Sequence, residues 1–381
     1  MIFLAYRLGV LGIGHWFERL YEGIKKTDEI QLVNVAGVSS VDDKRERLTR
    51  LGVPESNYFQ LKPSMPMPER FFDNVDIVHI SDPNEFHAQQ TLQTLYMGKI
   101  ALTEKTFGVN RDEFEEVLNY IESNAIETRA YLHLHYADKL LTLELPKLLE
   151  RLTKDCGKVV STSATFFELE NPKFDRRRVW IFEMKNGGIF MDWVHPFEVY
   201  YKGALARRFH LLDMTPYIIN SGYSDSDPTG VHAIVEIEGE HFKRGAIADI
   251  RVGMGLRSSS LRKRMRFFFE NASYLDLNFI NSEEEYVSED RGSWELFDRH
   301  GKIIESGHPK GPTSSDIFMN DILELCRGRH PGFSTDDLRI IFEQQWRYQE
   351  MLKSKRLVRD EKKIESFVNE GMENKAGAQK G

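Results

Sequence analysis

The segment from Asp76 to Lys105 constrains the fold of this chain most, because it joins two apolar runs through one amphipathic stretch. Its pattern predicts four elements in order: a strand over Ile77–Ile80, a Pro-Asn turn, a helix from about Glu85 to Met97 that Gly98 ends, and a strand over Ile100–Leu102. Elements in this order form one βαβ unit of a parallel sheet. Ligands of open parallel sheets bind beyond the carboxyl ends of the strands. We therefore expect a ligand beside the Asp82-Pro83-Asn84 turn and the Glu104-Lys105 pair, which both follow strand ends.

A glycine turn follows the first apolar run of the chain and precedes a helical pattern. Gly12 and Gly14 occupy the first two positions of G-x-G-x-x-G, where glycine allows a tight turn and lets backbone N–H groups approach a pyrophosphate at a helix N-terminus. Phe17 stands at the third position, where glycine normally allows close packing of helix on strand. A plain strand-turn-helix connection is the alternative. The place of the turn at the start of an α/β chain favours dinucleotide binding.

The second predicted strand, about Ile30–Val38, is not followed by the acidic residue that would bind the adenosine ribose of NAD. Hydroxyls and cations stand there instead: Ser39, Ser40, Lys44 and Arg45. Such donors suit a 2′-phosphate, which favours NADP over NAD. In the alternative interpretation, Asp42 or Asp43 reaches the ribose, and the basic residues form a solvated helix face.

Composition excludes several classes of protein. The chain has 381 residues, of which 41% are hydrophobic, enough for two cores. Its net charge of -8 argues against a nucleic-acid partner, and no apolar run has the length of a membrane span. The opening residues predict a first strand rather than a signal peptide, so we expect a cytoplasmic location. Cys156 and Cys326 indicate reduced thiols, and their spacing predicts no metal site.

The pattern of the chain changes near residue 130. Before it, strands alternate with helices; after it come long β-type runs over Val159–Leu169, His232–Ile237, Ala246–Val252 and Met265–Glu270. Late helices are predicted over Ser315–Arg327 and Ser334–Lys353. We expect three parts: a Rossmann domain with a doubly wound parallel sheet over residues 1–130, an α+β domain with a large, open, mostly antiparallel sheet over residues 131–368, and a polar, frayed tail over residues 369–381.

Within the second domain, the segment Gly187–His195 contains the strongest candidates for catalytic residues. Asp192 and His195 are three residues apart, which places a carboxylate and an imidazole on one face of a helix. The Asp would orient the ring while the His exchanges a proton with a substrate hydroxyl. In the alternative interpretation, Asp192 is a helix N-cap and His195 is a partly buried structural residue.

Together these motifs resemble those of the glucose-fructose oxidoreductase, inositol dehydrogenase and rhizopine-catabolism family of NAD(P)-dependent oxidoreductases, the Gfo/Idh/MocA family. The resemblance covers nearly the whole chain. It rests on six segments in the family's order: Gly9–Gly14, Asp82–His87, Gly98-Lys99, Glu104-Lys105-Thr106, Gly187–His195 and the late helix-turn-helix over Asp316–Gln345. Three departures are Phe17, Thr106 in place of the family's proline, and an Asp-to-His spacing one residue shorter than usual.

The resemblance implies a Rossmann domain followed by an α/β domain whose open sheet forms a homodimer or homotetramer interface. By position, Lys105 matches the lysine that contacts the nicotinamide and the reacting hydroxyl, His195 matches the acid/base histidine, and Asp192 matches an aspartate that helps bind substrate. The expected cofactor-binding residues are Gly12, Ile13, Gly14, His15, Trp16, Ser39, Ser40, Asp82, Pro83, His87, Glu104 and Lys105.

The reaction that we expect is hydride transfer between nicotinamide C4 and a carbinol carbon of a sugar, sugar derivative or cyclitol. His195 would take the hydroxyl proton, and Lys105 would stabilise the developing alkoxide. Candidates for the substrate-binding wall are Tyr136, His135, Arg178 and Trp180. Arg176, Arg177 and Arg178 could bind a phosphate or carboxylate, or form a solvated charge run. His133 and His135 could suggest a metal, but alternate strand residues share a face for ordinary reasons, and no third ligand is evident.

Two other functions stay open, because a fold does not dictate chemistry. One is a dinucleotide-binding sensor or regulatory protein of the same fold that has lost turnover. The other is a reductase of a C=C or C=N bond in a non-sugar substrate, which needs the hydride donor but not the Lys105, Asp192 and His195 set.

Overall fold

The computed structural model describes most of the chain and divides it into two units. The described residues are 5–62, 65–169, 183–186, 188–219, 227–256, 263–279, 292–330 and 332–369. The first unit comprises Met1–His135 with Thr313–Leu338, and the second comprises Tyr136–Pro312 with Arg339–Gly381. Among the described residues, no helix is both long and apolar enough to cross a bilayer. The predicted polar tail begins at the last described residue and otherwise lies outside them.

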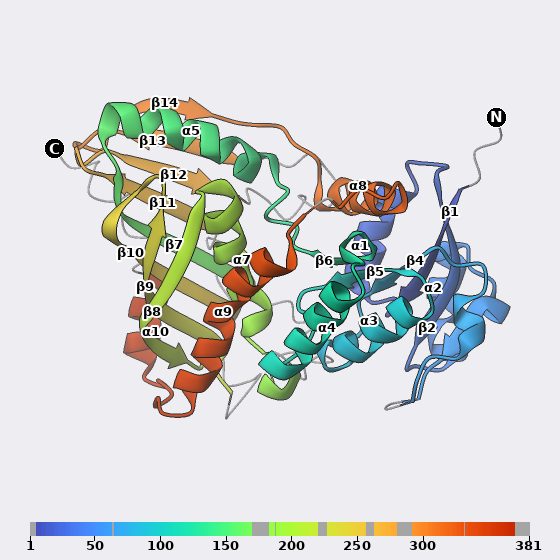
Figure 1. The fold of residues 1–381 in the computed structure, drawn as a ribbon. Helices are drawn as coiled ribbons and strands as arrows, with labels where there is room; N and C mark the ends of the chain where they lie inside the picture. Colours follow the sequence, from blue (N-terminus) through green and yellow to red (C-terminus); the bar gives the residue numbers. More distant parts are fainter. Residues whose placement is uncertain are drawn as a thin grey trace. The chain divides into compact units, whose positions relative to one another are not determined.

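A parallel sheet forms the centre of the first unit (Figure 1). Its strands are β1 (Tyr6–Leu11), β2 (Ile30–Gly37), β3 (Tyr58–Gln60), β4 (Ile77–Ile80), β5 (Ile100–Glu104) and β6 (Ala130–His133). They lie in the order β3-β2-β1-β4-β5-β6, and all their pairings are parallel. The predicted strand over Ile77–Ile80 is confirmed, and the one predicted over Ile100–Leu102 continues to Glu104. This doubly wound order confirms the predicted Rossmann sheet.

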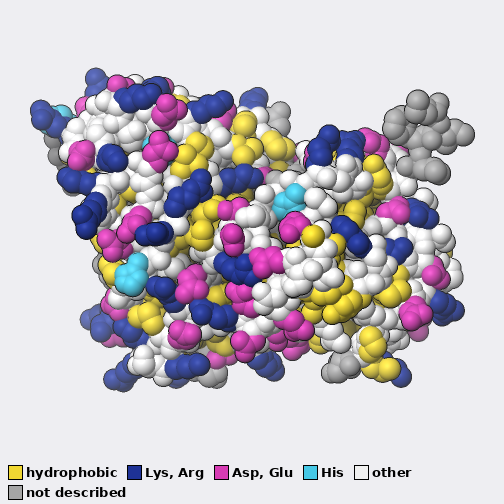
Figure 2. All heavy atoms as spheres, viewed as in Figure 1, with side chains coloured by type: hydrophobic (Ala, Val, Ile, Leu, Met, Phe, Trp, Pro, Cys, Tyr) yellow, Lys and Arg dark blue, Asp and Glu magenta, His cyan; other side chains and the backbone are white. Residues whose placement is uncertain are grey.

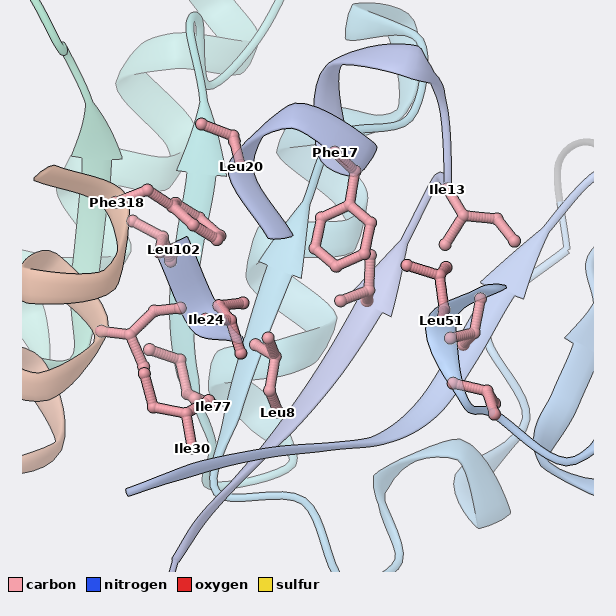
Figure 3. Close-up of a cluster of buried hydrophobic side chains, with 14 of the residues drawn as sticks. Leu8, Ile13, Phe17, Leu20, Ile24, Ile30, Leu51, Ile77, Leu102 and Phe318 are labelled. Carbon is pink, nitrogen blue, oxygen red and sulfur yellow. The ribbon is translucent and has the colours of Figure 1, made fainter. Parts of the chain in front are cut away.

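Helices cover both faces of this sheet. They are α1 (His15–Ile24), α2 (Val41–Leu51), α3 (His87–Tyr96), α4 (Arg111–Ser123) and α8 (Ser314–Cys326). One face is covered by α1, α2 and α8, whose apolar side chains pack on strand residues such as Leu8, Ile77 and Leu102 (Figure 3). Burial of this cluster supplies much of the driving force for folding of the unit.

The position of α8 differs from the predicted domain boundaries, which assigned all of residues 131–368 to the second domain. The helix packs on α1, and Phe318 lies fully buried beside Leu102 in the core of the first unit (Figure 3). A capping box starts it, because Thr313 accepts from the Asp316 N–H while the Asp316 carboxylate accepts from the Thr313 N–H. The sequence shows that one face of this helix is apolar, but the three-dimensional contacts decide which sheet it covers.

The second unit is built on a large, mostly antiparallel sheet (Figure 1). Its strands are β7 (Val159–Leu169), β8 (Ala206–Tyr217), β9 (Gly230–Gly239), β10 (Phe242–Leu256), β11 (Arg264–Phe269), β12 (Tyr274–Asn278), β13 (Ser293–Phe297) and β14 (Ile303–Gly307). The order is β14-β13-β12-β11-β7-β10-β9-β8, and only the pairing of β7 with β10 is parallel among the described strands. The predicted fold class of this part is confirmed.

Among the described residues, the helices that accompany this sheet are α5 (Leu140–Cys156), α7 (Phe190–Glu198), α9 (Thr335–Leu352) and α10 (Glu361–Asn369). A π-helical turn, Val199–Gly203, continues α7 directly. It brings the Tyr200 hydroxyl to 3.0 Å from that of Thr162 on β7, so α7 is fixed on one face of the sheet. On the face of the molecule that Figure 2 draws, acidic and basic side chains are interspersed rather than separated.

Candidate functional site

The glycine turn after β1 lies directly against the turn after β4. Gly12 has a φ of +84°, and a Cβ added there would lie 2.7 Å from both the backbone nitrogen and the Oδ1 atom of Asp82. Gly14 is the N-cap of α1, and no side-chain cap bonds to it among the described residues. A tight glycine turn that leads into the uncapped N-terminus of a helix is suited to binding phosphate. The departure at Phe17 is compensated, because this buried ring packs 5.6 Å from the ring of His79.

His87 connects the turns that follow β4 and β5. Its Nε2 atom lies 2.7 Å from the carbonyl oxygen of Asp82, and its Nδ1 atom lies 2.8 Å from that of Thr106. Burial lowers the pKa of His87, and the two carbonyls act in the opposite direction. The residue is 1% exposed, and its two contacts join these turns; its predicted role as a cofactor contact stays a prediction. The peptide bond between Lys105 and Thr106, in the turn after β5, is cis.

Asp82 is a buried acid within the predicted cofactor site. Its Oδ2 atom accepts a hydrogen bond of 2.8 Å from Gln90 Nε2. Burial raises the pKa of the Asp82 carboxyl to about 6, against the opposing effects of Gln90 and the charge of Lys44. Asp82 also lines a small pocket with Val38, at the end of β2. The pocket lies beyond the carboxyl ends of β2 and β4, at the edge where parallel sheets bind ligands.

Glu104, the last residue of β5, is buried and bonded to side chains of α1 and β4. Its Oε1 atom accepts hydrogen bonds from Trp16 Nε1, at 2.9 Å, and from His79 Nε2, at 3.3 Å. Burial acts to raise the pKa of Glu104, but the interactions with His133, His79 and Trp16 outweigh it and lower the pKa to about 2. The side chains of Glu104 and Trp16 are therefore hydrogen-bonded to one another, and their predicted contacts with the cofactor stay a prediction.

The residues predicted to bind a 2′-phosphate are partly engaged elsewhere. The Ser40 hydroxyl is the N-cap of α2: it accepts from the Asp43 N–H at 3.2 Å and donates to the Asp43 carboxylate at 2.6 Å. Arg45 is paired with Asp42 and with Glu55, each at 2.7 Å. Ser39 accepts the Tyr58 hydroxyl through its carbonyl oxygen. A 2′-phosphate at this strand end would have to compete with these contacts.

In the second unit, α7 holds an imidazole between two carboxylates. His195 Nδ1 lies 2.6 Å from Glu198 Oε1, and His195 Nε2 lies 3.5 Å from Asp192 Oδ1. The other oxygen of Glu198 accepts from the Ala137 N–H at 3.0 Å. All three side chains are buried. The helix begins at Phe190, so Asp192 lies in its first turn and the alternative that Asp192 is the N-cap is wrong.

Glu198 was missed by the sequence analysis, although its spacing was visible. It lies three residues after His195, as His195 lies three after Asp192, so all three face the same side of α7. With Glu198 accepting the proton of Nδ1, Nε2 is the ring nitrogen left to exchange a proton with a substrate. That arrangement suits a base which takes a proton from a hydroxyl.

Tyr136 lies beside His195, with the ring centroids 4.6 Å apart. Two buried cations lie over the Tyr136 ring: Lys263 Nζ at 5.1 Å and Lys139 Nζ at 5.4 Å from its centroid. Lys263 is also paired with Glu168. Neither lysine belongs to a recognisable motif, so only the fold could reveal them near His195.

The remaining predicted residues are placed as follows. His135, expected in the substrate wall, packs in the first unit with its ring 5.6 Å from that of Trp16. Arg176, Arg177, Arg178, Trp180 and Gly187 lie outside the described residues, as does the side chain of His15. His133 Nδ1 is 2.8 Å from Asp321 Oδ2. Across the part of the chain that the structure describes, no three His, Cys, Asp or Glu side chains are grouped as metal ligands.

The fold and the two candidate sites define a class of protein: a Rossmann unit with a tight glycine turn after β1, followed by an open-sheet unit with a buried acid–imidazole–acid set. Solved structures share this architecture. KijD10, a 3-ketoreductase from Actinomadura kijaniata in complex with NADP and TDP-benzene, matches with a TM-score of 0.69 at 15% identity, over 93% of this chain and 99% of that one.

A second match is the aldose-aldose oxidoreductase from Caulobacter crescentus complexed with glycerol, with a TM-score of 0.69 at 13% identity, over 92% of this chain and 99% of that one. These identities establish a shared fold. Protein-family models give no match to the sequence, and neither do curated protein sequences.

Proposed function

We propose that this protein is an NADP-dependent oxidoreductase that transfers a hydride between nicotinamide C4 and a carbinol carbon of a sugar, sugar derivative or cyclitol. The turn at Gly12 carries the proposal, because its backbone approaches the end of β4 so closely that only glycine fits. NADP is preferred to NAD because no acidic residue directly follows β2, where Val38, Ser39 and Ser40 come after Gly37. The NADP in the KijD10 structure supports the same choice.

The cofactor would lie against Gly12, Ile13 and Gly14 and supply hydride chemistry. Lys105, at the end of β5, would stabilise the alkoxide that develops on the substrate oxygen. His195 would take the hydroxyl proton at Nε2 while Glu198 holds the proton on Nδ1. Asp192, on the Nε2 side of the ring, would help to bind the substrate.

The substrate proposed here is sugar-like, and two observations favour an anionic one. Lys139 and Lys263 bring two ammonium groups to the ring beside His195. KijD10, which has the same fold, is a 3-ketoreductase whose structure holds TDP-benzene. A sugar phosphate or a nucleotide-linked sugar therefore belongs in the first substrate panel.

We also propose that the protein forms a homodimer or homotetramer through the open sheet and works in the cytoplasm. The large, mostly antiparallel sheet of the second unit supports this, because the family that the sequence resembles uses such an open sheet as an oligomer interface. A particle mass from light scattering tests this: a dimer or tetramer is expected, and a monomer at micromolar concentration would contradict it.

Titration with NADPH and NADH by fluorescence, followed by a screen for turnover, tests the function. The panel contains neutral sugars, cyclitols, sugar phosphates and nucleotide-linked sugars, and the nicotinamide absorbance is the readout. Preferential binding of NADPH with turnover on any of them is expected. Binding without turnover would favour the dinucleotide sensor, and failure to bind either nucleotide would overturn the proposal.

A further inference from the structure

Ionisable side chains form a buried row below the carboxyl ends of β4, β5 and β6. His79, Glu104 and His133 come from these three strands, and Glu104 lies directly opposite His133 in the parallel register. The row continues to α8, where Asp321 Oδ2 lies 2.8 Å from His133 Nδ1. None of the four residues is more than 8% exposed. We call this set the Glu104 row.

Apolar rings enclose the row, so its members depend on one another for polar contacts. The ring of Phe318 lies 4.5 Å from that of His79 and 5.6 Å from that of His133. Phe17 packs against His79 from α1. A buried ionisable group destabilises a fold unless it is paired and hydrogen-bonded. A row of this kind is stable in one arrangement, because displacing one member leaves another without its partner.

The protonation states follow from the contacts. Burial lowers the pKa of His79, which favours the neutral ring, and its contact with the Glu104 carboxylate places the proton on Nε2. His133 faces the Asp321 carboxylate with Nδ1, so that nitrogen carries the proton it donates. Glu104 is the ionised centre of the row, and it accepts from both His79 and Trp16.

The contact with Trp16 gives the row a role beyond packing. Trp16 lies in the first turn of α1, two residues after Gly14, and Lys105 directly follows Glu104. One hydrogen bond of 2.9 Å therefore connects the turn that would receive the pyrophosphate to the strand end that carries Lys105. We propose that Glu104 is a positioning residue that fixes the first turn of α1 relative to the end of β5, and that His133, which lies opposite Glu104 in the strand register and contacts Asp321, supports this arrangement.

Two replacements of similar volume in the full-length protein test the role of Glu104. Glu104→Gln removes the charge but keeps an oxygen that accepts from Trp16, whereas Glu104→Met removes the acceptor as well. We measure the Trp16 emission, as the difference between each protein and its Trp16→Phe counterpart, and the Kd for NADPH. Glu104→Met is expected to shift the Trp16 emission and to raise the Kd about 10-fold, while Glu104→Gln keeps the emission and stays within about 3-fold of the wild type.

A matched pair on α8 tests the outer part of the row. Asp321→Asn weakens the contact between Asp321 and His133. Asp316, in the same helix but outside the row, is the control: Asp316→Asn weakens the capping box of α8 and the ion pair of Asp316 with Lys26. Asp321→Asn is expected to raise the Kd for NADPH about 3-fold and to move the Trp16 emission part of the way toward that of Glu104→Met. Asp316→Asn is expected to lower Tm without changing either quantity.

The outcomes separate this proposal from the function on which its cofactor readout rests. If Glu104→Met leaves both the Trp16 emission and the Kd at wild-type values, the positioning role is wrong. It is also wrong if Kd rises in all variants in proportion to the loss of Tm, because the row would then be only structural. If the wild type binds neither NADPH nor NADH, the proposed function fails, and the Trp16 emission of the Gln and Met variants alone decides the positioning role.

Discussion

The backbone geometry of Gly12 leads to a prediction about the affinity for the cofactor. Gly12→Ala would place a methyl group 2.7 Å from the backbone nitrogen of Asp82 at a φ of +84°, so either β1 or β4 must shift. We expect the Kd for NADPH to rise about 100-fold, because the positive φ alone disfavours alanine by about 1–2 kcal/mol and the steric contact adds to it. Fluorescence titration measures this.

Gly52→Ala is the matched control. Gly52 also has a positive φ, +70°, but nothing lies within 4 Å of an added Cβ. This change should lower stability by about 1 kcal/mol and leave the affinity for NADPH unchanged. Equal losses of affinity in the two variants would contradict a specific role for the Gly12 turn.

Burial of Asp82 predicts that its contribution to the free energy of unfolding falls as pH rises from about 4 to 6. Burial raises the pKa of its carboxyl to about 6, so the folded protein holds a proton there that the unfolded chain has released above about pH 4. The destabilising contribution of Asp82 therefore grows as pH rises from about 4 to 6, and is constant above that range. Asp82→Asn keeps an acceptor for Gln90 and removes the titration, so its Tm advantage over the wild type should widen between pH 4 and 6 and then level off. An advantage that is constant with pH would contradict this.

Glu198 sets the orientation and tautomer of His195 in the proposed reaction. Glu198→Gln keeps the shape but replaces the carboxylate that lies 2.6 Å from Nδ1 with an amide. We expect kcat to fall by about 10–100-fold, part of the 10²–10⁴ that general acid–base groups contribute, while the Kd for NADPH is unchanged. Steady-state kinetics on the first active substrate measures this. A loss confined to cofactor affinity would count against the role assigned to His195.

Single residues also show what the sequence could not supply. Gly12, Asp192 and His195 were predicted because their signals are local: a turn after a strand, and a spacing of three on a helix. The roles of His87 and Glu104 were not, because their partners, the Thr106 carbonyl and the Trp16 indole, come from other elements. Glu198 had a local signal that a search limited to one carboxylate and one histidine overlooked.

Elements were predicted well wherever their pattern was strong. The strand over Val159–Leu169 has its predicted bounds, and the helix predicted over Ser315–Arg327 spans Ser314–Cys326. The sheet partners of β7 were not predicted, since residue alternation gives the faces of a strand but not its neighbours. The same limit explains α8, whose apolar face was evident but whose place on the first unit was not.

The packing of α8 on the first unit leads to a prediction about the free energy of unfolding. Phe318 is fully buried against α1 and the end of the parallel sheet, so Phe318→Ala should lower the free energy of unfolding by about 3–5 kcal/mol. Urea unfolding followed by circular dichroism measures this. Met65→Ala, at a side chain that is 59% exposed in the same unit, should change it by less than about 0.5 kcal/mol. Similar losses in both variants would mean that α8 does not belong to the core of this unit.

The whole molecule joins segments that are distant in the sequence, and ligand binding should reveal this. Because α8 belongs to the unit that holds the Gly12 turn, saturating NADPH should slow amide exchange in α8 together with that in β1 and α1. β14, which precedes α8 by a few residues in the sequence but belongs to the second unit, serves as the control and should show no change. Hydrogen-exchange mass spectrometry resolves these segments. Protection that stops at residue 135 would contradict the division into units.

Because α8 lies late in the sequence, the first unit can be completed only late in translation. The first unit is complete only when Leu338 has left the ribosome, although its last strand ends at His133. At the usual pace of translation, roughly 10–40 s separate these two events. During that interval the face of the sheet around Leu102 and Tyr131 lacks the cover that Phe318 later provides. The nascent chain therefore exposes an apolar surface of the first unit, which chaperones would shield until α8 has been synthesised.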